Sequence, residues 1–251
     1  MTGTKNSGGE WVRRFHPAAA GGTRLAAFPH AGGSASYWYP LSEALAPAVE
    51  TLAIQYPGRQ DRRHEEPLRS LPELADRAFE ALPECADRPL VLFGHSLGSV
   101  LAFEVARRLQ DAGRTPAHLF ASGYPAPSRL RGGDVHRRGD EGIVEELRTV
   151  GGTDPVWLEN AEFMESVLPA LRADYTAIET HARGDAVLDC PLTVLTGDDD
   201  PHTTVDEAKA WGEHTAAAFD LRVFPGGHFY LDRHLPEITG LIADTAEGIT
   251  G

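Results

Sequence analysis

A serine between two glycines lies near the middle of the chain, in the segment Gly94-His95-Ser96-Leu97-Gly98. This Gly-x-Ser-x-Gly pattern follows the apolar stretch PLVLF at 89–93 and opens a run with helical spacing at 97–113. A strand, a sharp turn and a helix in that order hold a serine hydroxyl clear of a sheet as a nucleophile. The alternative is a structural turn, since glycine and serine are common turn residues. The context favours Ser96 as a catalytic nucleophile.

A serine hydroxyl is a weak nucleophile unless a neighbouring base takes its proton, and that base needs an acid to orient it. Of the eleven histidines, His228 is the best candidate base. It lies in the segment FPGGHFYL at 224–231, where glycines allow close approach of another backbone and no helical pattern includes it. His95, His181 and His202 lie beside a motif or within helix-like runs, and we interpret them as surface histidines.

The orienting acid is expected from the segment LTVLTGDDDPH, which contains another predicted strand. Asp198, Asp199 and Asp200 come between the serine and the histidine, and this is the chain order of α/β hydrolases. We favour Asp200, because Pro201 biases the residue before it toward extended backbone. Asp198 is the alternative. No further oxygen-ligand pattern accompanies the three carboxylates, so we expect no metal site.

Two backbone N–H groups must also face the oxygen that becomes negative during acyl transfer. One is expected from Leu97, the residue after the nucleophile. The other is expected from Ala31, in the segment His30-Ala31-Gly32-Gly33, which is close to the HGGG element of lipases and esterases. The alternative is that this segment is only a flexible turn before a helix.

Short apolar runs alternate with helix-like stretches along the chain, which predicts a mostly parallel central sheet with helices on both faces. Both triad partners of Ser96 follow predicted strands, so the three side chains are expected at one edge of the sheet. The predicted strands are residues 11–15, 23–28, 50–55, 89–93, 117–122, 191–196 and 220–224, and the clearest helices are 71–84, 97–113 and 235–246.

The interval between the strands at 117–122 and 191–196 is far longer than the dozen or so residues that a parallel crossover needs. Its helix-like parts are 141–150 and 160–181. We therefore expect one domain over residues 1–251, with a helical lid insertion at about 125–188 over the ligand-binding strand ends. A structural subdomain without a gating role is the alternative. Four lid residues line an acyl chamber or form the lid's own core: Trp157, Phe163, Met164 and Tyr175.

The composition excludes several classes of protein. A formal net charge of −14 over 251 residues argues against a nucleic-acid partner, which needs a basic surface. No apolar run is long enough to span a bilayer, and the polar start MTGTKNSGGE, interpreted as disordered, does not resemble a signal peptide. Cys85 and Cys190 do not suggest a disulfide framework, and we interpret both as small buried residues. A cytoplasmic location without membrane contact is expected.

Four motifs together resemble a known family. They are FPHAGGSASYW at 28–38, YPGRQDR at 56–62, GHSLGS at 94–99 and FPGGHFYL at 224–231. In this order and spacing, the chain resembles the type II thioesterases that accompany polyketide synthases and nonribosomal peptide synthetases. The resemblance extends from about Phe15 to the last predicted helix. GHSLG alone would suit many hydrolases, whereas its combination with the first two motifs is far more specific.

The resemblance implies an α/β-hydrolase fold with a helical lid. It also implies hydrolysis of acyl groups held as thioesters on the phosphopantetheine arm of acyl or peptidyl carrier proteins, and thereby removal of aberrant or stalled chains. By position it assigns Ser96, Asp200 and His228 to a catalytic triad, because GDDD matches the family's Gly-x-x-Asp. It implies no dissociable cofactor.

Carrier proteins are usually acidic, so an acidic enzyme needs local basic patches to bind them. Arg137 and Arg138, near the start of the lid, are the candidate carrier-binding residues, within a patch that includes Arg129 and Arg131. Arg59, Arg62 and Arg63 form a second basic patch. The alternative for each patch is an ordinary solvated surface. The rival functions are a carboxylesterase or lipase that acts on oxygen esters, and a non-catalytic protein that only binds carriers.

Overall fold

Seven strands form one sheet in the computed structural model, which describes residues 8–82 and 88–250. The strand order is β1-β3-β2-β4-β5-β6-β7; β1 pairs antiparallel with β3, and the other neighbours are parallel. The strands are β1 (Val12–Arg13), β2 (Arg24–Phe28), β3 (Glu50–Ile54), β4 (Leu90–His95), β5 (His118–Ser122), β6 (Leu192–Gly197) and β7 (Phe219–Phe224). The mostly parallel sheet predicted from the sequence is confirmed.

The central strands are buried on both faces, which explains their continuous apolar runs. In β4 every residue after Leu90 is buried, and in β6 every residue is. The edge strand β7 is different, because most of its side chains are exposed. The bounds of every predicted strand lie within two residues of those of an observed one. The first is the shortest, Val12–Arg13, and begins after Trp11, which ends a helical turn.

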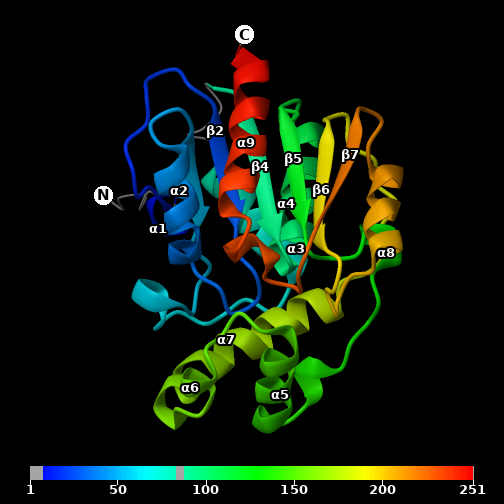
Figure 1. Cartoon of the computed structure of the whole chain (residues 1–251). Helices are drawn as coiled ribbons and strands as arrows, with labels where there is room; N and C mark the ends of the chain where they lie inside the picture. The colour runs from blue at the N-terminus through cyan, green and yellow to red at the C-terminus, as the bar shows by residue number, and fades with distance from the viewer. Residues whose placement is uncertain (1–7, 83–87, 251) are drawn as a thin grey trace.

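Helices cover both faces of the sheet (Figure 1). On one face, α2 (Tyr39–Leu45) packs beside α9 (Leu235–Thr250). On the other face, α3 (Leu71–Ala81) packs on α4 (Leu97–Asp111), and α8 (Val205–Lys209) packs on β6. Among the described residues, the remaining short helices outside the lid are α1 (Gly8–Trp11), η1 (Ala35–Trp38), η2 (Gln60–Arg62), η6 (Ala210–His214) and η7 (Tyr230–Asp232).

A group of helices between β5 and β6 lies across the carboxyl ends of the strands, at the bottom of Figure 1. The group consists of α5 (Asp140–Val150), α6 (Pro155–Leu158) and α7 (Ala161–Glu179), preceded by η4 (Pro127–Arg129) and η5 (Val135–Arg137). We call these elements the lid. The helix-like stretches at 141–150 and 160–181 match α5 and α7 closely. A gating role for the lid stays a prediction.

Two further expectations concern the membrane and the cysteines. Among the residues that the structure describes, no helix is both long enough and apolar enough to cross a bilayer. Cys190 is a buried free thiol, and burial raises its pKa to about 11. A thiol that stays protonated and enclosed fits the structural role predicted for it. Cys85 lies outside the described residues.

Candidate active site

Ser96 occupies a strained turn between β4 and α4. Its backbone angles are φ 56° and ψ −125°, a left-handed conformation that is unusual for a residue with a side chain. The Ser96 N–H donates to the carbonyl of Ser122 at 2.8 Å, and Ser99 donates to the Ser96 carbonyl through both its N–H and its hydroxyl. Strain that is held in place by such bonds is a frequent property of functional residues.

The two glycines of the motif are required by close backbone contacts. A Cβ atom on Gly94 would lie 2.0 Å from the carbonyl oxygen of Gly98, and one on Gly98 would lie 2.2 Å from the carbonyl oxygen of Phe28. These contacts bring β2, β4 and α4 together directly below Ser96. The turn can therefore be this tight only because both positions lack a side chain.

We expect Gly98→Ala to lower the free energy of unfolding by about 1–3 kcal/mol, because the backbone of β2 or α4 must move to admit the methyl group. Gly240→Ala is the matched control, since Gly240 lies exposed in α9 with open space around its Cα. That substitution should stabilise the protein by about 0.5–1 kcal/mol through the better helix propensity of alanine. Urea unfolding curves measure both changes in the free energy of unfolding. Equal changes would contradict the requirement for a glycine at position 98.

His228 and Asp200 meet in a buried pair. The Nδ1 atom of His228 lies 3.0 Å from Oδ1 and 2.9 Å from Oδ2 of Asp200, and their side chains are 3% and 0% exposed. Because a carboxylate accepts only, Nδ1 carries the proton, which leaves Nε2 as the free basic nitrogen. Asp200 also accepts the N–H of His202 at 2.8 Å, so its orientation is fixed from a second side.

Asp198 has a different position from Asp200. Its Oδ1 accepts the N–H of Gly226 at 2.8 Å, and its own N–H donates to the carbonyl of Phe224. Asp199 also donates its N–H to the carbonyl of Gly226, at 3.0 Å. Asp198 therefore joins the loop after β6 to the loop that carries the histidine, and it is Asp200 that lies against the His228 imidazole.

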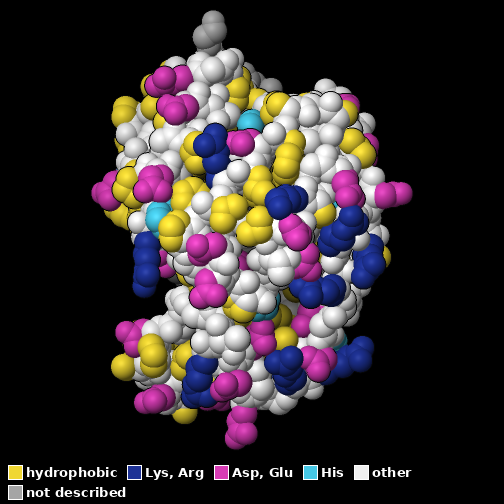
Figure 2. Space-filling model, turned by 45° about the vertical axis from the view of Figure 1, so that its right-hand side comes forward, with side chains coloured by type: hydrophobic (Ala, Val, Ile, Leu, Met, Phe, Trp, Pro, Cys, Tyr) yellow, Lys and Arg dark blue, Asp and Glu magenta, His cyan; other side chains and the backbone are white. Residues whose placement is uncertain are grey.

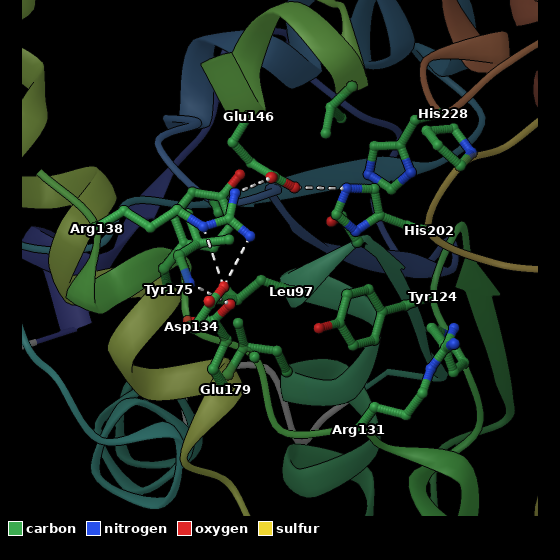
Figure 3. Close-up of a pocket in the computed structure, with 18 residues that line it drawn as sticks. Leu97, Tyr124, Arg131, Asp134, Arg138, Glu146, Tyr175, Glu179, His202 and His228 are labelled. Atoms are coloured by element: carbon green, nitrogen blue, oxygen red, sulfur yellow. Dashed lines mark hydrogen bonds and ion pairs between the residues drawn. The ribbon is translucent and has the colours of Figure 1, made fainter. Parts of the chain in front are cut away.

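Two adjoining cavities lie beneath the lid, and Ser96, His228 and Ala31 line both of them. One has a volume of about 230 Å³ and a partly charged lining, shown in Figure 3. The other, of about 100 Å³, has a mostly apolar lining that consists of His30, Ala31, Gly32, Ser96, Leu147, Val150, Gly151, Thr153, Phe163, Val167, Leu171, Tyr175, His228 and Phe229. The backbone N–H of Ala31 has no hydrogen-bond partner within the described part of the chain.

The larger cavity, hereafter the polar cavity, is crossed by a chain of polar contacts between the lid and the loop after β6 (Figure 3). Arg138 pairs with Asp134 at 2.7 Å and with Glu146 of α5 at 3.0 Å. Glu146 also lies 3.0 Å from Nε2 of His202, and the hydrogen bond with His202 lowers the pKa of Glu146. The loop that carries Asp200 is thus in direct contact with the lid.

The interpretation of His95 as a surface residue is wrong. His95 is fully buried, and its ring centroid lies 4.9 Å from that of His228. Nδ1 of His95 lies 3.0 Å from the hydroxyl of Ser122, which in turn lies 2.6 Å from that of Tyr230. Burial, with the nearby His228 and His30, holds the pKa of His95 well below its usual range, so the ring is neutral at pH 7. The sequence signal for this burial was the position of His95 at the end of the apolar run that forms β4.

The four lid residues predicted to line a chamber or form the lid core have different positions in the structure. Phe163 and Tyr175 line the smaller cavity, hereafter the apolar cavity, and Tyr175 also lines the polar cavity. Met164 is buried beside the outer groove between α5 and α7, away from Ser96. Trp157 is 51% exposed, so it belongs neither to a chamber nor to a core. The exposed Trp157 contradicts both expectations for that residue.

The predicted basic patches are less available than expected. Arg59 and Arg62 are each only 6% exposed. The prediction that they form a basic surface patch with Arg63 is therefore wrong. In the other patch, Arg129 pairs with Glu213 and Arg131 with Glu207, and Arg138 is paired as described. Arg137 is exposed and has no carboxylate partner among the described residues. Figure 2 shows basic and acidic side chains interspersed on the face in view.

Comparison with known proteins decides the family. The family model for a thioesterase domain matches residues 23–245. The chain belongs to the thioesterase family. A Streptomyces griseus thioesterase, named "Probable cadicidin biosynthesis thioesterase", is 49% identical over 97% of this chain and 68% of its own. Thioesterase PikA5 of Streptomyces venezuelae is 47% identical over 94% of this chain and 85% of its own.

Solved structures extend this result to the fold. The type II thioesterase BorB from the borrelidin biosynthetic cluster superposes with a TM-score of 0.89, at 45% identity, over 98% of this chain and all of its own. The predicted resemblance to type II thioesterases is confirmed, and so is the α/β-hydrolase fold. The protein is an enzyme, a thioesterase of the kind found with polyketide and nonribosomal peptide biosynthesis.

Proposed function

We propose that the protein hydrolyses acyl groups from the phosphopantetheine arm of carrier proteins, with Ser96, His228 and Asp200 as its catalytic triad. The observation that supports this most strongly is the buried His228–Asp200 pair, because its histidine lines the same two cavities as Ser96, a serine on a strained turn. Membership of the thioesterase family supplies the class of reaction.

Acylation begins when Nε2 of His228 takes the hydroxyl proton of Ser96 and the Ser96 oxygen attacks the thioester carbonyl. Asp200 holds the imidazole in the required tautomer and stabilises the cation that forms. The N–H groups of Ala31 and Leu97 donate to the negative oxygen, an interaction worth about 10²–10³ in rate for each donor. The carbon–sulfur bond then breaks, the thiol leaves with the proton from His228, and the acyl group remains on Ser96.

Deacylation repeats the same steps with water. His228 takes a proton from the water molecule while its oxygen attacks the acyl-Ser96 ester. The carbon–oxygen bond to Ser96 breaks, His228 returns the proton to the serine, and the carboxylic acid leaves.

The two cavities suggest how the substrate lies. Burial of an acyl chain is most favourable in the apolar cavity, which Phe163, Leu171 and Phe229 help to line. The pantetheine arm carries amide groups, which need hydrogen-bond partners when they are enclosed. The polar cavity, which holds Arg138, Glu146 and His202, offers such partners. We therefore place the acyl chain in the apolar cavity and the arm in the polar one.

The biological role that fits this reaction is editing, in which acyl groups that block a carrier are removed. One sequence relative is named for cadicidin biosynthesis, and solved relatives come from the borrelidin biosynthetic cluster and from the NRPS/PKS pathway of yersiniabactin, which supports a synthase carrier domain as the partner. A cytoplasmic location stays a prediction.

A matched substrate panel tests the proposal. The same short acyl group is presented on a carrier protein, on pantetheine, and as an oxygen ester of a simple alcohol. We expect kcat/KM to be highest for the acyl-carrier and lowest for the oxygen ester. Higher kcat/KM for oxygen esters would support the rival carboxylesterase or lipase function, and binding of carriers without hydrolysis would support the non-catalytic one.

Arg137 and Arg138 are proposed to contact the carrier. We expect Arg137→Glu to lower kcat/KM for the acyl-carrier about threefold or more, since rim charges act mainly on association, and to leave turnover of acyl-pantetheine unchanged. Arg138→Glu also breaks the pair with Glu146, so it is the less selective variant. Arg77→Glu in α3 is the control, with the same charge change outside the lid. If Arg137→Glu had the same kcat/KM as Arg77→Glu both with the acyl-carrier and with acyl-pantetheine, the assignment of Arg137 to carrier binding would be contradicted.

A further inference from the structure

A carboxylate from the lid is buried against the loop that carries Ala31. Asp174, on α7, is fully buried, and its Oδ2 accepts the backbone N–H of Gly32 at 2.7 Å. Gly32 has φ +74°, and a Cβ atom there would lie 2.5 Å from Leu171, one turn before Asp174 on the same helix. The lid helix is therefore packed directly on the residue that follows Ala31, through one apolar contact and one hydrogen bond.

Arg59 completes this contact from the other side. Its Nη2 pairs with the same oxygen of Asp174, its Nε donates to the carbonyl of Gly33 at 3.1 Å, and its Nη1 donates to that of Pro57 at 2.7 Å. Both side chains are buried, so loss of either partner would leave the other as an uncompensated buried charge. The arginine of the YPGR motif thus links the loop after β3, the loop after β2 and the lid.

The backbone around Ala31 is bonded on both sides. The N–H of Gly33 donates to the carbonyl of His30 at 3.0 Å, that of Gly32 donates to Asp174, and the carbonyl of Gly33 accepts from Arg59. The N–H of Ala31 itself has no partner in the described chain. Ala31 therefore has a free N–H donor in a peptide frame that its neighbours hold in place, which is what stabilisation of a developing oxyanion requires.

We propose that Asp174 is a positioning residue, which acts through Gly32 and Arg59 to hold the Ala31 N–H in the oxyanion hole. This inference rests on the proposed function. It makes α7 a part of the catalytic apparatus, because the donor is correctly placed only while the lid helix is seated on the loop. A displacement of about 1 Å in such a group can cost about 10²-fold in rate.

The test compares variants of Asp174 in the full chain, with acyl-pantetheine as substrate. We expect Asp174→Ala to lower kcat about 10²-fold with KM within about threefold of wild type. Asp174→Asn should lie between Asp174→Ala and wild type, because the amide oxygen still accepts but is the weaker partner for Arg59. Glu165→Ala, on the exposed side of the same helix, is the control and should match wild type.

A second measurement separates positioning from a general loss of structure. An alkyl boronic acid forms a tetrahedral adduct with Ser96 whose oxygen occupies the oxyanion hole, whereas an alkyl-pantetheine thioether binds without one. We expect Asp174→Ala to weaken the boronic acid about as much as it lowers kcat and to leave thioether affinity nearly unchanged. If Asp174→Ala does not fold, Asp174→Asn is the variant that tests the inference. We then expect its affinity for the boronic acid to be at least about threefold below that of wild type.

The outcomes distinguish this inference from the proposed function. Wild-type kcat and boronic acid affinity in Asp174→Asn and Asp174→Ala would overturn the inference, as would equal losses of boronic acid and thioether affinity. Failure of the proposed function would be seen in the wild-type protein itself. Wild type would not hydrolyse acyl-pantetheine, and any binding of the boronic acid would persist in Ser96→Ala.

Discussion

Ser96→Ala is expected to lower kcat for acyl-carrier hydrolysis by about 10³-fold or more, because no other serine among the described residues lines either cavity and loss of a catalytic serine removes the covalent route. The variant should fold, since the hydroxyl has no hydrogen-bond partner in the described chain and the backbone bonds of Ser96 are retained. Initial rates and a thermal unfolding curve measure both effects.

Ser166→Ala is the control for this substitution. Ser166 is an exposed residue of α7 whose hydroxyl donates only to the carbonyl of Phe163 within the same helix. Its kcat should equal that of wild type. If Ser96→Ala keeps more than about a tenth of the wild-type kcat while Ser166→Ala behaves as expected, Ser96 is not the nucleophile.

Asp200→Asn is expected to lower kcat about 10⁴-fold with little change in stability. The asparagine can present its NH₂ group to Nδ1 of His228, which then favours the tautomer with the proton on Nε2 and removes the free base. Asp198→Asn is the matched control two residues earlier, because its amide oxygen can still accept the N–H of Gly226. That variant should keep kcat within about tenfold of wild type.

The pair of variants also decides between the two aspartates that the sequence left open. A large loss in Asp198→Asn together with a small loss in Asp200→Asn would reverse the assignment. Steady-state rates with acyl-pantetheine are sufficient, because the proposed roles concern the chemical step and not carrier binding.

The sheet could be predicted well from the sequence because its central strands are buried on both faces. Such strands read as short apolar runs with glycine or polar residues after them, as in β4 before Gly94 and β6 before Asp198. Short helices were harder. The five-residue α8 and the four-residue α6 have too few turns to show a period, and they depend on their N-terminal caps, Thr204 and Asp154, and on packing.

The site could be predicted only where a motif carried the chemistry. Ser96 and His228 stand in recognisable segments, and the structure places both on the same cavities. Arg59 and Asp174 could not be found in this way, because an arginine or an aspartate in a sequence is usually exposed. Their burial depends on a contact between residues 115 positions apart, which no local pattern reports. The one available signal for Arg59 was its place in a motif that supported the family resemblance.

The central claim is that the acyl group passes through an ester on Ser96. Rapid mixing of the enzyme with an acyl-carrier, acid quenching within the first turnover and peptide mass mapping test this most directly. We predict an added acyl mass on the peptide that contains residues 94–99, which disappears as free acid accumulates and is absent in Ser96→Ala. Acid release at the wild-type rate with no acyl mass on that peptide, or with the acyl mass on another residue, would contradict it.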